Sequence, residues 1–271
     1  MDNLVEYYNK FNEDKRLLSR HGQVEYAVTK HYLDECIALL KTDKEAANSD
    51  NDVISLADIG AGTGRYSIAL AKEGYSVTSV EYVQHNLGIL KKHMIEEGLS
   101  FEAFKGDARH LKKLKDNTYD VTLLLGPMYH LHSDDDKVMA LKEAMRITKP
   151  GGYIFVAYVM ADYAVIKYGF MEEHIKESIS KGALTDDYRI KADDNELYDY
   201  VRIEDIDRIN KLAGAMRDYI FAPDGAADYI RSYLNDMDEE SFELFIDYQI
   251  KNAKRKELLG ASSHLVDVIR V

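Results

Sequence analysis

The sequence predicts an α/β protein with a doubly wound, mostly parallel sheet at its centre. Two observations predict it. Between residues 53 and 159, short apolar segments alternate with helix-like segments, a pattern typical of parallel strands joined by right-handed crossovers. Three of the apolar segments are almost continuously hydrophobic, as expected of strands that are covered on both faces. They span residues 53–59, 119–125 and 153–159.

The composition fits one large domain, or one domain with an elaborated cap. A chain of 271 residues buries most of the surface that its unfolded form exposes, and 46% hydrophobic with 31% charged residues is typical of a globular protein. The single cysteine, Cys36, excludes a disulfide framework and a cysteine-built metal site. The net charge of −13 argues against a general nucleic-acid binder.

The sequence also indicates a cytoplasmic protein without a membrane partner. No apolar segment approaches the ~20 residues that a membrane-spanning helix needs. The first 18 residues are polar and mixed in charge, so they do not resemble a signal peptide.

The elements follow in order from these patterns. Residues 1–46 are expected to be helical, because apolar side chains recur at three- and four-residue spacing from Val24 to Cys36. Turn-forming residues 48–52 separate this segment from the first strand. The alternation then predicts a helix at 65–73, a strand at 75–81, a helix at 84–97, strands at 101–107 and 119–125, a helix at 133–148 and a strand at 153–159.

After Val159 the alternation stops, which indicates an insertion. Residues 160–200 are expected to hold a helical stretch and a β-hairpin with arms at 188–192 and 196–201. A helix at 202–213, a strand near 218–221, a long helix at 239–258 and a closing strand at 265–271 should follow. The chain therefore divides into an N-terminal helical segment (1–46), a core (47–159), a cap insertion (160–200) and a C-terminal part of the core (201–271).

A glycine-rich loop from Asp58 to Arg65, DIGAGTGR, joins the first strand to the first core helix. Glycines let the backbone turn sharply and let a ligand approach without meeting a Cβ, and amides at a helix start favour a carboxylate or phosphate. A dinucleotide fingerprint would need glycine at position 65, but here the third glycine, Gly64, comes one residue early. A tight turn without a ligand remains an alternative for the loop taken alone.

Two further acids end the next two strands, Glu81 and Asp107. Ligands of open α/β sheets bind outside the carboxyl ends of the strands, so Asp58, Glu81 and Asp107 should face one crevice. An acid at the second strand suits the two hydroxyls of a ribose, and one at the third suits an exocyclic amine such as that of adenine. Each acid alone is more often a strand-end cap, whereas the three together indicate a ligand site.

At these motifs the chain resembles the class I S-adenosylmethionine-dependent methyltransferases. The resemblance covers about residues 53–159 and rests on DIGAGTGRYSIALAKEGYSVTSVEY, GDA, YDVTLLLG and KPGGYIFVAY. The segment LGPMYHL at 125–131 is most similar to the small-molecule branch. The resemblance implies a seven-stranded Rossmann-like methyltransferase sheet of order 3-2-1-4-5-7-6 with an antiparallel last strand, and N-terminal helices over the cofactor.

The resemblance also assigns cofactor contacts. Those residues are Gly60, Ala61, Gly62 and Gly64 in the loop around the methionine part, Asp58 as the support of that loop, Glu81 for the ribose with Tyr82 near the adenine, Asp107 and Ala108 for the adenine, and Leu125 and Gly126 beside the sulfonium. Gly126-Pro127-Met128-Tyr129 lacks the first Asn or Asp of the motif in amino-methylating DNA enzymes, and no Pro-Cys pair exists for cytosine-C5 chemistry.

The catalytic residues are less defined by the sequence. His130 follows the fourth strand, where a general base would meet an acceptor, although a structural role is an alternative. A metal site from His130 and His132 lacks a third ligand, so no metal is expected. Seven tyrosines between Tyr153 and Tyr200 either line an acceptor pocket or pack the cap, and His264 either enters that pocket or is packed or solvated.

The expected activity is methyl transfer from S-adenosylmethionine to a small-molecule acceptor, with S-adenosylhomocysteine as product. Two alternatives stay open: an RNA or protein methyltransferase with the same core, and a binding protein that holds the cofactor without turnover. The sequence specifies neither the acceptor atom nor the oligomeric state.

Overall fold

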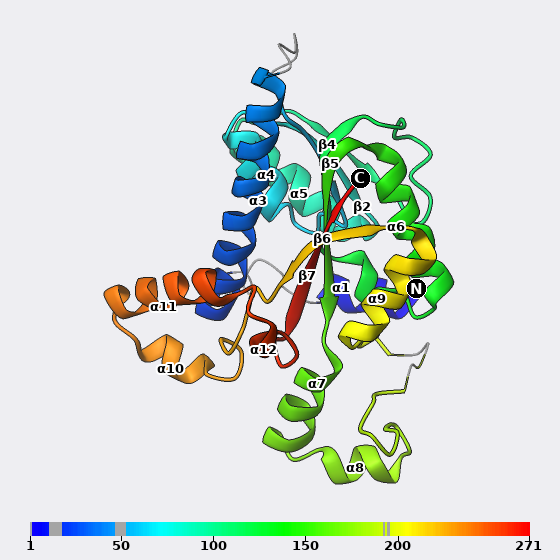
Figure 1. Ribbon diagram of the computed structural model, residues 1–271, viewed down its shortest axis with the longest axis vertical. Helices are drawn as coiled ribbons and strands as arrows, with labels where there is room; N and C mark the ends of the chain where they lie inside the picture. Colours follow the sequence, from blue (N-terminus) through cyan, green and yellow to red (C-terminus); the bar gives the residue numbers. More distant parts are fainter. Residues whose placement is uncertain (1, 11–17, 47–52, 192, 194–195) are drawn as a thin grey trace.

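A computed structural model describes residues 2–10, 18–46, 53–191, 193 and 196–271. Within these residues one seven-stranded sheet has the order β3-β2-β1-β4-β5-β7-β6 (Figure 1). All pairings are parallel except those of β7 with β5 and β6, so the predicted fold class and strand order are confirmed. The strands are β1 Ser55–Ile59, β2 Ser76–Glu81, β3 Glu102–Lys105, β4 Tyr119–Leu124, β5 Thr148–Val159, β6 Met216–Phe221 and β7 His264–Arg270.

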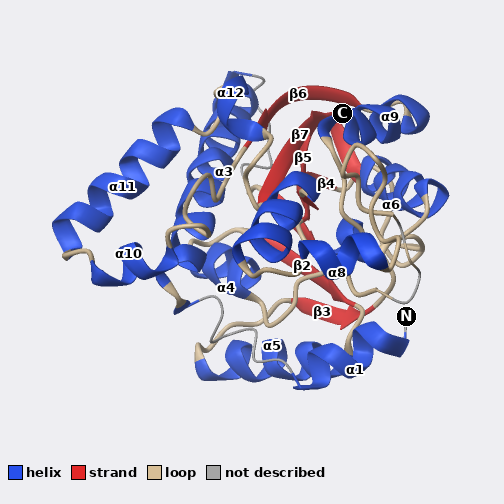
Figure 2. Cartoon of the chain, turned by 90° about the horizontal axis from the view of Figure 1, so that it is seen from below, coloured by secondary structure: helices blue, strands red, loops and turns tan. Residues whose placement is uncertain are grey.

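Helices cover both faces of the sheet, as the apolar strands predict (Figure 2). The longer ones are α1 Asp2–Lys10, α3 Arg20–Ala46, α4 Arg65–Lys72, α5 Gln84–Glu96, α6 Asp134–Ile147, α9 Ile203–Ala213 and α11 Glu239–Asn252, and the shorter ones are α10 Arg231–Asp236 and α12 Lys256–Leu259. Ser133 caps α6 by accepting the amide of Asp136. Every described helix is too short or too polar to cross a lipid bilayer.

The side chains of β5 alternate between two hydrophobic clusters, one on each face. Ile154 and Val156 join the cluster beneath α6 and α9, whereas Tyr153 and Phe155 join the cluster beneath α3. In Figure 1, α3 accordingly lies on one side of the sheet and α6 and α9 on the other. Both clusters are almost fully buried, so the sheet forms a rigid platform for whatever lies at its edge.

The described part of the N-terminal segment is helical, as predicted, and α3 packs on the core. Helix α3 buries Val24, Val28 and Leu33 against the sheet. Arg20, at its start, donates to the carbonyls of Leu234 and Met237 at 2.9 and 2.7 Å. The turn expected at 48–52 lies outside the described residues.

The insertion after β5 projects beyond the carboxyl end of that strand (Figure 1). It contains α7 Ala161–Ala164, the π-helical turn η2 Val165–Met171 and α8 Ile175–Ser180. The name "cap" is used below for residues 160–201.

The predicted β-hairpin in the cap is wrong. In the described parts of its two arms the pairing is limited to single bridges, Leu184 with Ile190 and Met160 with Val201. The arms are held by ion pairs to other elements instead: Arg189 binds Asp205 of α9 at 2.5 Å. Two of the predicted turn residues, 194 and 195, lie outside the described residues.

Several boundaries also differ from the predictions; β5, for example, begins at Thr148 and not at residue 153. The helix expected at 239–258 divides into α11 and α12, because Ala253 is fully buried and its carbonyl accepts the amide of Ala222 at 2.9 Å. Strand β3 ends at Lys105, before Asp107, and the next residue, Gly106, donates its amide to the Glu81 carbonyl at 3.1 Å.

Candidate active site

The glycine-rich loop leaves β1 through backbone conformations that require glycine. Gly60 and Gly62 have φ of +79° and +56°. A Cβ on Gly60 would lie 2.6 Å from Cδ of Pro127, whereas a Cβ on Gly62 would meet nothing within 4 Å. The loop therefore packs on the turn after β4 at Gly60 and leaves open space at Gly62.

Gly64 occupies a different position from the one expected. It is the N-cap of α4, and a Cβ there would lie 2.8 Å from Cγ of Leu90. Among the described residues that line the neighbouring cavity, Gly64 does not appear. Its observed role is close packing between α4 and α5.

Glu81 connects the end of β2 to the loop. Its two carboxylate oxygens accept the amides of Gly62 at 2.8 Å and Val83 at 2.7 Å. The side chain is buried, and burial raises its pKa, although these two amides stabilise the ionised form. The carboxylate is thus held in place at the floor of the cavity, with lone pairs still available for a ligand.

Asp58, near the end of β1, is hydrogen-bonded to the helix that follows the loop. Its carboxylate accepts from the Ser67 hydroxyl at 2.5 Å, and the Ser79 hydroxyl donates to Ser67 at 2.8 Å. This chain of hydrogen bonds joins β1, α4 and β2. Burial raises the pKa of Asp58 to about 6.

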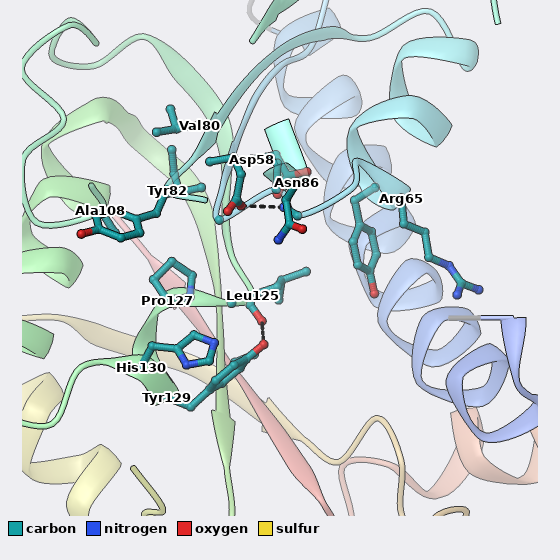
Figure 3. A pocket seen from close by; sticks show the side chains of 18 of the residues that line it. Asp58, Arg65, Val80, Tyr82, Asn86, Ala108, Leu125, Pro127, Tyr129 and His130 are labelled. Carbon is teal, nitrogen blue, oxygen red and sulfur yellow. Dashed lines mark hydrogen bonds between the residues drawn. The ribbon is translucent and has the colours of Figure 1, made fainter. Parts of the chain in front are cut away.

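One cavity brings together the predicted site residues other than Gly64. It opens at the carboxyl ends of β1, β2 and β4, and its lining includes Asp58, Gly60, Ala61, Gly62, Glu81, Tyr82, Asp107, Ala108, Leu125, Gly126 and His130. In Figure 3, Tyr82 and Ala108 lie on one side and Tyr129 and His130 on the other, with Pro127 between them. We call this the loop cavity.

Asp107 has a partner that sequence reasoning missed, Arg109. The carboxylate accepts the Arg109 backbone amide at 2.9 Å and its Nη2 at 2.7 Å, and Arg109 also binds Asp136 at 3.0 Å. Burial alone would raise the pKa of Asp107, but the hydrogen bonds from Arg109 outweigh it and the pKa is lowered. Asp107 is therefore an ionised acceptor whose position Arg109 fixes.

The N-terminal helices form one wall of the loop cavity. The sequence did not indicate which of their residues face it. Leu4 and Tyr8 of α1 and Glu25 and Tyr26 of α3 line the loop cavity. Arg65 stacks on the Tyr26 ring at 4.1 Å. Asn86, at the start of α5, is a further buried lining residue.

His130 sits in the 3₁₀ turn Pro127–His130 that follows β4. Its Nδ1 lies 2.9 Å from the Leu197 carbonyl and its Nε2 lies 3.2 Å from the Tyr8 hydroxyl. Because a carbonyl only accepts, Nδ1 carries the proton and Tyr8 donates to Nε2. Burial lowers the pKa of His130 to about 4, so the imidazole is neutral and a weak proton acceptor.

A second cavity of about 680 Å³ lies between the loop cavity and the cap. We call it the cap cavity. Both cavities share the lining residues Tyr8, Glu25, Tyr129 and His264.

Both interpretations of the cap tyrosines hold for part of the set. Tyr163, Tyr168, Tyr198 and Tyr200 line the cap cavity. Tyr153 and Tyr158 are buried in the core, and Tyr188 is 45% exposed.

His264 and Asp224 meet where the two cavities join. Asp224 Oδ2 accepts both the backbone amide and Nδ1 of His264, each at 2.9 Å. One ligand atom from each of Glu25, Asp224 and His264 lies within 4.8 Å of the others, in the part of the chain that the structure describes. The sequence indicated His264 only as one of several options and did not indicate Asp224.

Comparison with known proteins places this geometry in a class. Residues 57–156 match a family described as a methyltransferase domain. The ubiquinone biosynthesis O-methyltransferase of Burkholderia orbicola is 29% identical over 150 residues, 55% of this chain and 62% of the relative. The corresponding enzyme of Caulobacter vibrioides is 29% identical over 121 residues, which cover 44% of this chain and 47% of the relative. The chain spans about three fifths of the first of these relatives and about half of the second.

Solved structures share the whole fold at low identity. A Thermotoga maritima S-adenosylmethionine-dependent methyltransferase, described as a possible histamine N-methyltransferase, has a TM-score of 0.57 at 19% identity and covers 99% of both chains. A Methanosarcina mazei methyltransferase has a TM-score of 0.53 at 14% identity, covering 83% of this chain and 96% of its own. These likenesses show the fold.

The strand order, the glycine loop with its two acids, and the family match define a class I S-adenosylmethionine-dependent methyltransferase core. Residues 57–156 match the methyltransferase-domain family, and the solved structures that share the fold include S-adenosylmethionine-dependent methyltransferases.

Proposed function

We propose that the protein transfers a methyl group from S-adenosylmethionine to a small-molecule acceptor. One observation carries the proposal: Glu81 binds the amide of Gly62 at 2.8 Å, which holds a ribose-binding carboxylate beside the loop that would receive the methionine part.

The residues present fit the cofactor. The open space at Gly62 leaves room for the methionine chain. The Glu81 oxygens accept the amides of Gly62 and Val83, and a carboxylate has about four acceptor sites, so it can still accept a ribose hydroxyl. The ionised Asp107 and the Ala108 amide would bind the adenine edges, with Tyr82 beside the ring. Leu125 and Gly126 would lie next to the sulfonium.

The bound cofactor supplies an electrophilic methyl group on a positively charged sulfur. The protein's own contribution is alignment of the acceptor with that group and exclusion of water, which supply most of the acceleration in such a displacement. The walls from α1 and α3, including Leu4 and Tyr26, and the cap above them are placed for both tasks.

The cap cavity supports a small-molecule acceptor. Its volume of about 680 Å³ falls within the range of small-molecule sites, and the net charge of −13 disfavours an RNA acceptor. The curated relatives are named as O-methyltransferases of ubiquinone biosynthesis, which favours oxygen over nitrogen as the acceptor atom.

Two measurements test the proposal on the full chain. Calorimetry should show binding of S-adenosylhomocysteine and none of NAD. A metabolite mixture incubated with methyl-labelled S-adenosylmethionine should then yield a labelled small molecule. Binding of NAD without S-adenosylhomocysteine would refute the cofactor, and binding without any transfer would favour a non-catalytic role.

A further inference from the structure

We infer that His264 is the general base of the acceptor site, that Asp224 orients it, and that the acceptor presents an aromatic hydroxyl. The inference rests on the proposed function and adds to it a base and a substrate class.

The sheet topology brings both residues to the ligand edge. Because β7 is antiparallel to β5, its first residue, His264, pairs with Val159 at the carboxyl end of β5. Strand β6 is antiparallel to β7 and so ends at the same edge, and Asp224 follows it by three residues. Ligands of this class of sheet bind along that edge.

The hydrogen bonds fix the state of the imidazole. The Asp224 side chain is only 4% exposed, and its Oδ2 accepts from both the amide and Nδ1 of His264. Because this oxygen already accepts the backbone amide, it acts as an acceptor toward Nδ1 as well, so Nδ1 carries the proton and the lone pair is on Nε2. A base held by a third group in this way is a recurring arrangement in enzymes that activate a nucleophile.

The position of the ring fits the role. His264 is 20% exposed and lines both the loop cavity and the cap cavity, so it adjoins the space where donor and acceptor meet. His130, the other histidine near this space, differs: burial lowers its pKa to about 4 although the hydrogen bond to the Leu197 carbonyl opposes this effect, so the ring is neutral. Of the two, only His264 has a carboxylate partner in the described structure.

The lining of the cap cavity indicates an aromatic acceptor. Tyr129, Tyr163, Tyr198 and Tyr200 form its aromatic wall, and the Tyr129 ring lies 6.2 Å from that of His264. Flat rings pack well against such a wall. An imidazole suits an aromatic hydroxyl, whose pKa is about 10 as in tyrosine, much better than a hydroxyl as weakly acidic as water, with a pKa of about 16.

The step balances without a further reactant. The acceptor oxygen forms a bond to the methyl carbon while the bond from that carbon to sulfur breaks, and its electron pair stays on sulfur. The hydroxyl proton passes to Nε2 of His264 and then to solvent. Asp224 stabilises the imidazolium that forms in between.

A divalent cation bound between Glu25, Asp224 and His264 is the alternative to the dyad, since these three side chains lie close enough to coordinate one ion. The hydrogen bond between Nδ1 and Asp224 favours the dyad, because it already uses the carboxylate oxygen nearest to the ring. The test must therefore distinguish the two.

We would compare the full-length wild type with His264→Gln, Asp224→Asn and His130→Gln. The probes are catechol and 4-nitrocatechol, whose hydroxyl is largely ionised at the assay pH. With catechol, His264→Gln should lose about 10²- to 10⁴-fold in kcat, and with 4-nitrocatechol much less. His130→Gln should affect both acceptors alike, and the affinity of His264→Gln for S-adenosylhomocysteine should change by less than about 3-fold.

A second readout does not depend on turnover. In ¹⁵N NMR spectra of histidine-labelled protein, the signal missing from His264→Gln should report a proton on Nδ1, and Asp224→Asn should alter that tautomer balance. The inference would be overturned if His264→Gln lost equal activity on both acceptors, or if Nδ1 carried no proton. Transfer to amines but not to phenols would also overturn it, and so would loss of activity with EDTA. Failure of the wild type to bind S-adenosylhomocysteine or to methylate anything would count against the proposed function itself.

Discussion

The amide of Gly62 donates to the carboxylate of Glu81 across 2.8 Å, and so the loop after β1 is joined directly to the end of β2. The loop needs a fixed acceptor for its amide, and the buried carboxylate needs donors to stabilise its charge.

Glu81→Ala should weaken S-adenosylhomocysteine binding by at least ~10-fold. Charge-assisted bonds to two ribose hydroxyls are worth about 1.5–3 kcal/mol each, and ~1.4 kcal/mol is tenfold in affinity. Calorimetry and a thermal melt measure both the loss and the integrity of the fold. Glu102→Ala, an exposed acid on the neighbouring strand β3, is the matched control and should bind normally. Unchanged affinity of Glu81→Ala would show that the carboxylate does not face the cofactor.

Asp58 should make the folded protein less stable as pH rises, the opposite of what an ion-paired carboxylate does. Burial raises its pKa to about 6 in the folded protein, above the ~4 of an unfolded chain. The folded state therefore binds this proton more tightly, and the stability it contributes is complete below pH ~4 and lost as pH rises through 6.

The variant Asp58→Asn cannot titrate at this position. The Tm of the wild type minus that of Asp58→Asn should fall between pH 4 and 7. Melts at matched ionic strength measure the difference, which removes the contribution of all other groups. A difference that stays constant or grows with pH would contradict the assignment.

The ion pair between Lys137 and Asp199 should stabilise the cap against the core. Lys137 is 2% exposed, and its ammonium binds Asp199 at 2.6 Å and the Leu131 carbonyl. Asp199→Ala would leave that charge buried without its counter-ion, at a cost of about 3 kcal/mol. The double variant Lys137→Met/Asp199→Leu should regain much of the loss, because apolar side chains replace the pair. Denaturant unfolding measures both, and a double variant no better than Asp199→Ala would show that the pair is not the cause.

The cap tyrosines should separate acceptor choice from cofactor binding. Tyr163 and Tyr198 line the cap cavity but not the loop cavity among the described residues, whereas Tyr188 is 45% exposed. Tyr163→Ala and Tyr198→Ala should change which members of a metabolite mixture become labelled, with S-adenosylhomocysteine affinity unchanged. Tyr188→Ala, the control, should change neither. A fall in Tm of the two cavity variants with an unaltered product pattern would mean that these tyrosines only pack the cap.

The wall from the N-terminal helices is best tested at single side chains. Helix α3 buries Val24 and Leu33 in the core, so deleting residues 1–35 would disrupt the fold. Tyr26→Ala instead removes a ring that lines the loop cavity and stacks with Arg65. S-adenosylhomocysteine affinity should fall several-fold by calorimetry, whereas Tyr7→Ala, a tyrosine of α1 outside the described lining, should retain it. Equal affinities in the two variants would argue against a wall at Tyr26.

The sheet and the loop cavity could be predicted from the sequence because their signals are local. Continuous apolar runs mark the buried strands, and acids at strand ends mark the ligand edge, as Asp58 and Glu81 show. The hairpin prediction failed for the opposite reason: Arg189 of the first arm is held by Asp205 of α9, and an ion pair to a different element leaves no periodic pattern in the sequence.

The contact between Asp224 and His264 could not be predicted from local sequence patterns, because it depends on the topology of the sheet. Forty residues separate the two side chains, and they meet only because the last two strands lie side by side at the edge of the sheet. For Gly64 the sequence left two roles indistinguishable, since a glycine needed for close packing against Leu90 looks the same in sequence as one that makes room for a ligand.

Helix α3 constrains how ligands can enter. Its first turns line the loop cavity at Gly22, Glu25 and Tyr26, and near its other end, about 30 Å away, Lys44 binds Asp120 at the start of β4 at 3.2 Å. A helix that is held at both ends resists movement as a rigid body. It cannot swing outward at the cavity without breaking contacts on the opposite side of the molecule. We therefore expect donor and product to enter and leave past other walls of the loop cavity, such as that formed by Leu4 and Tyr8 of α1, and not by movement of α3.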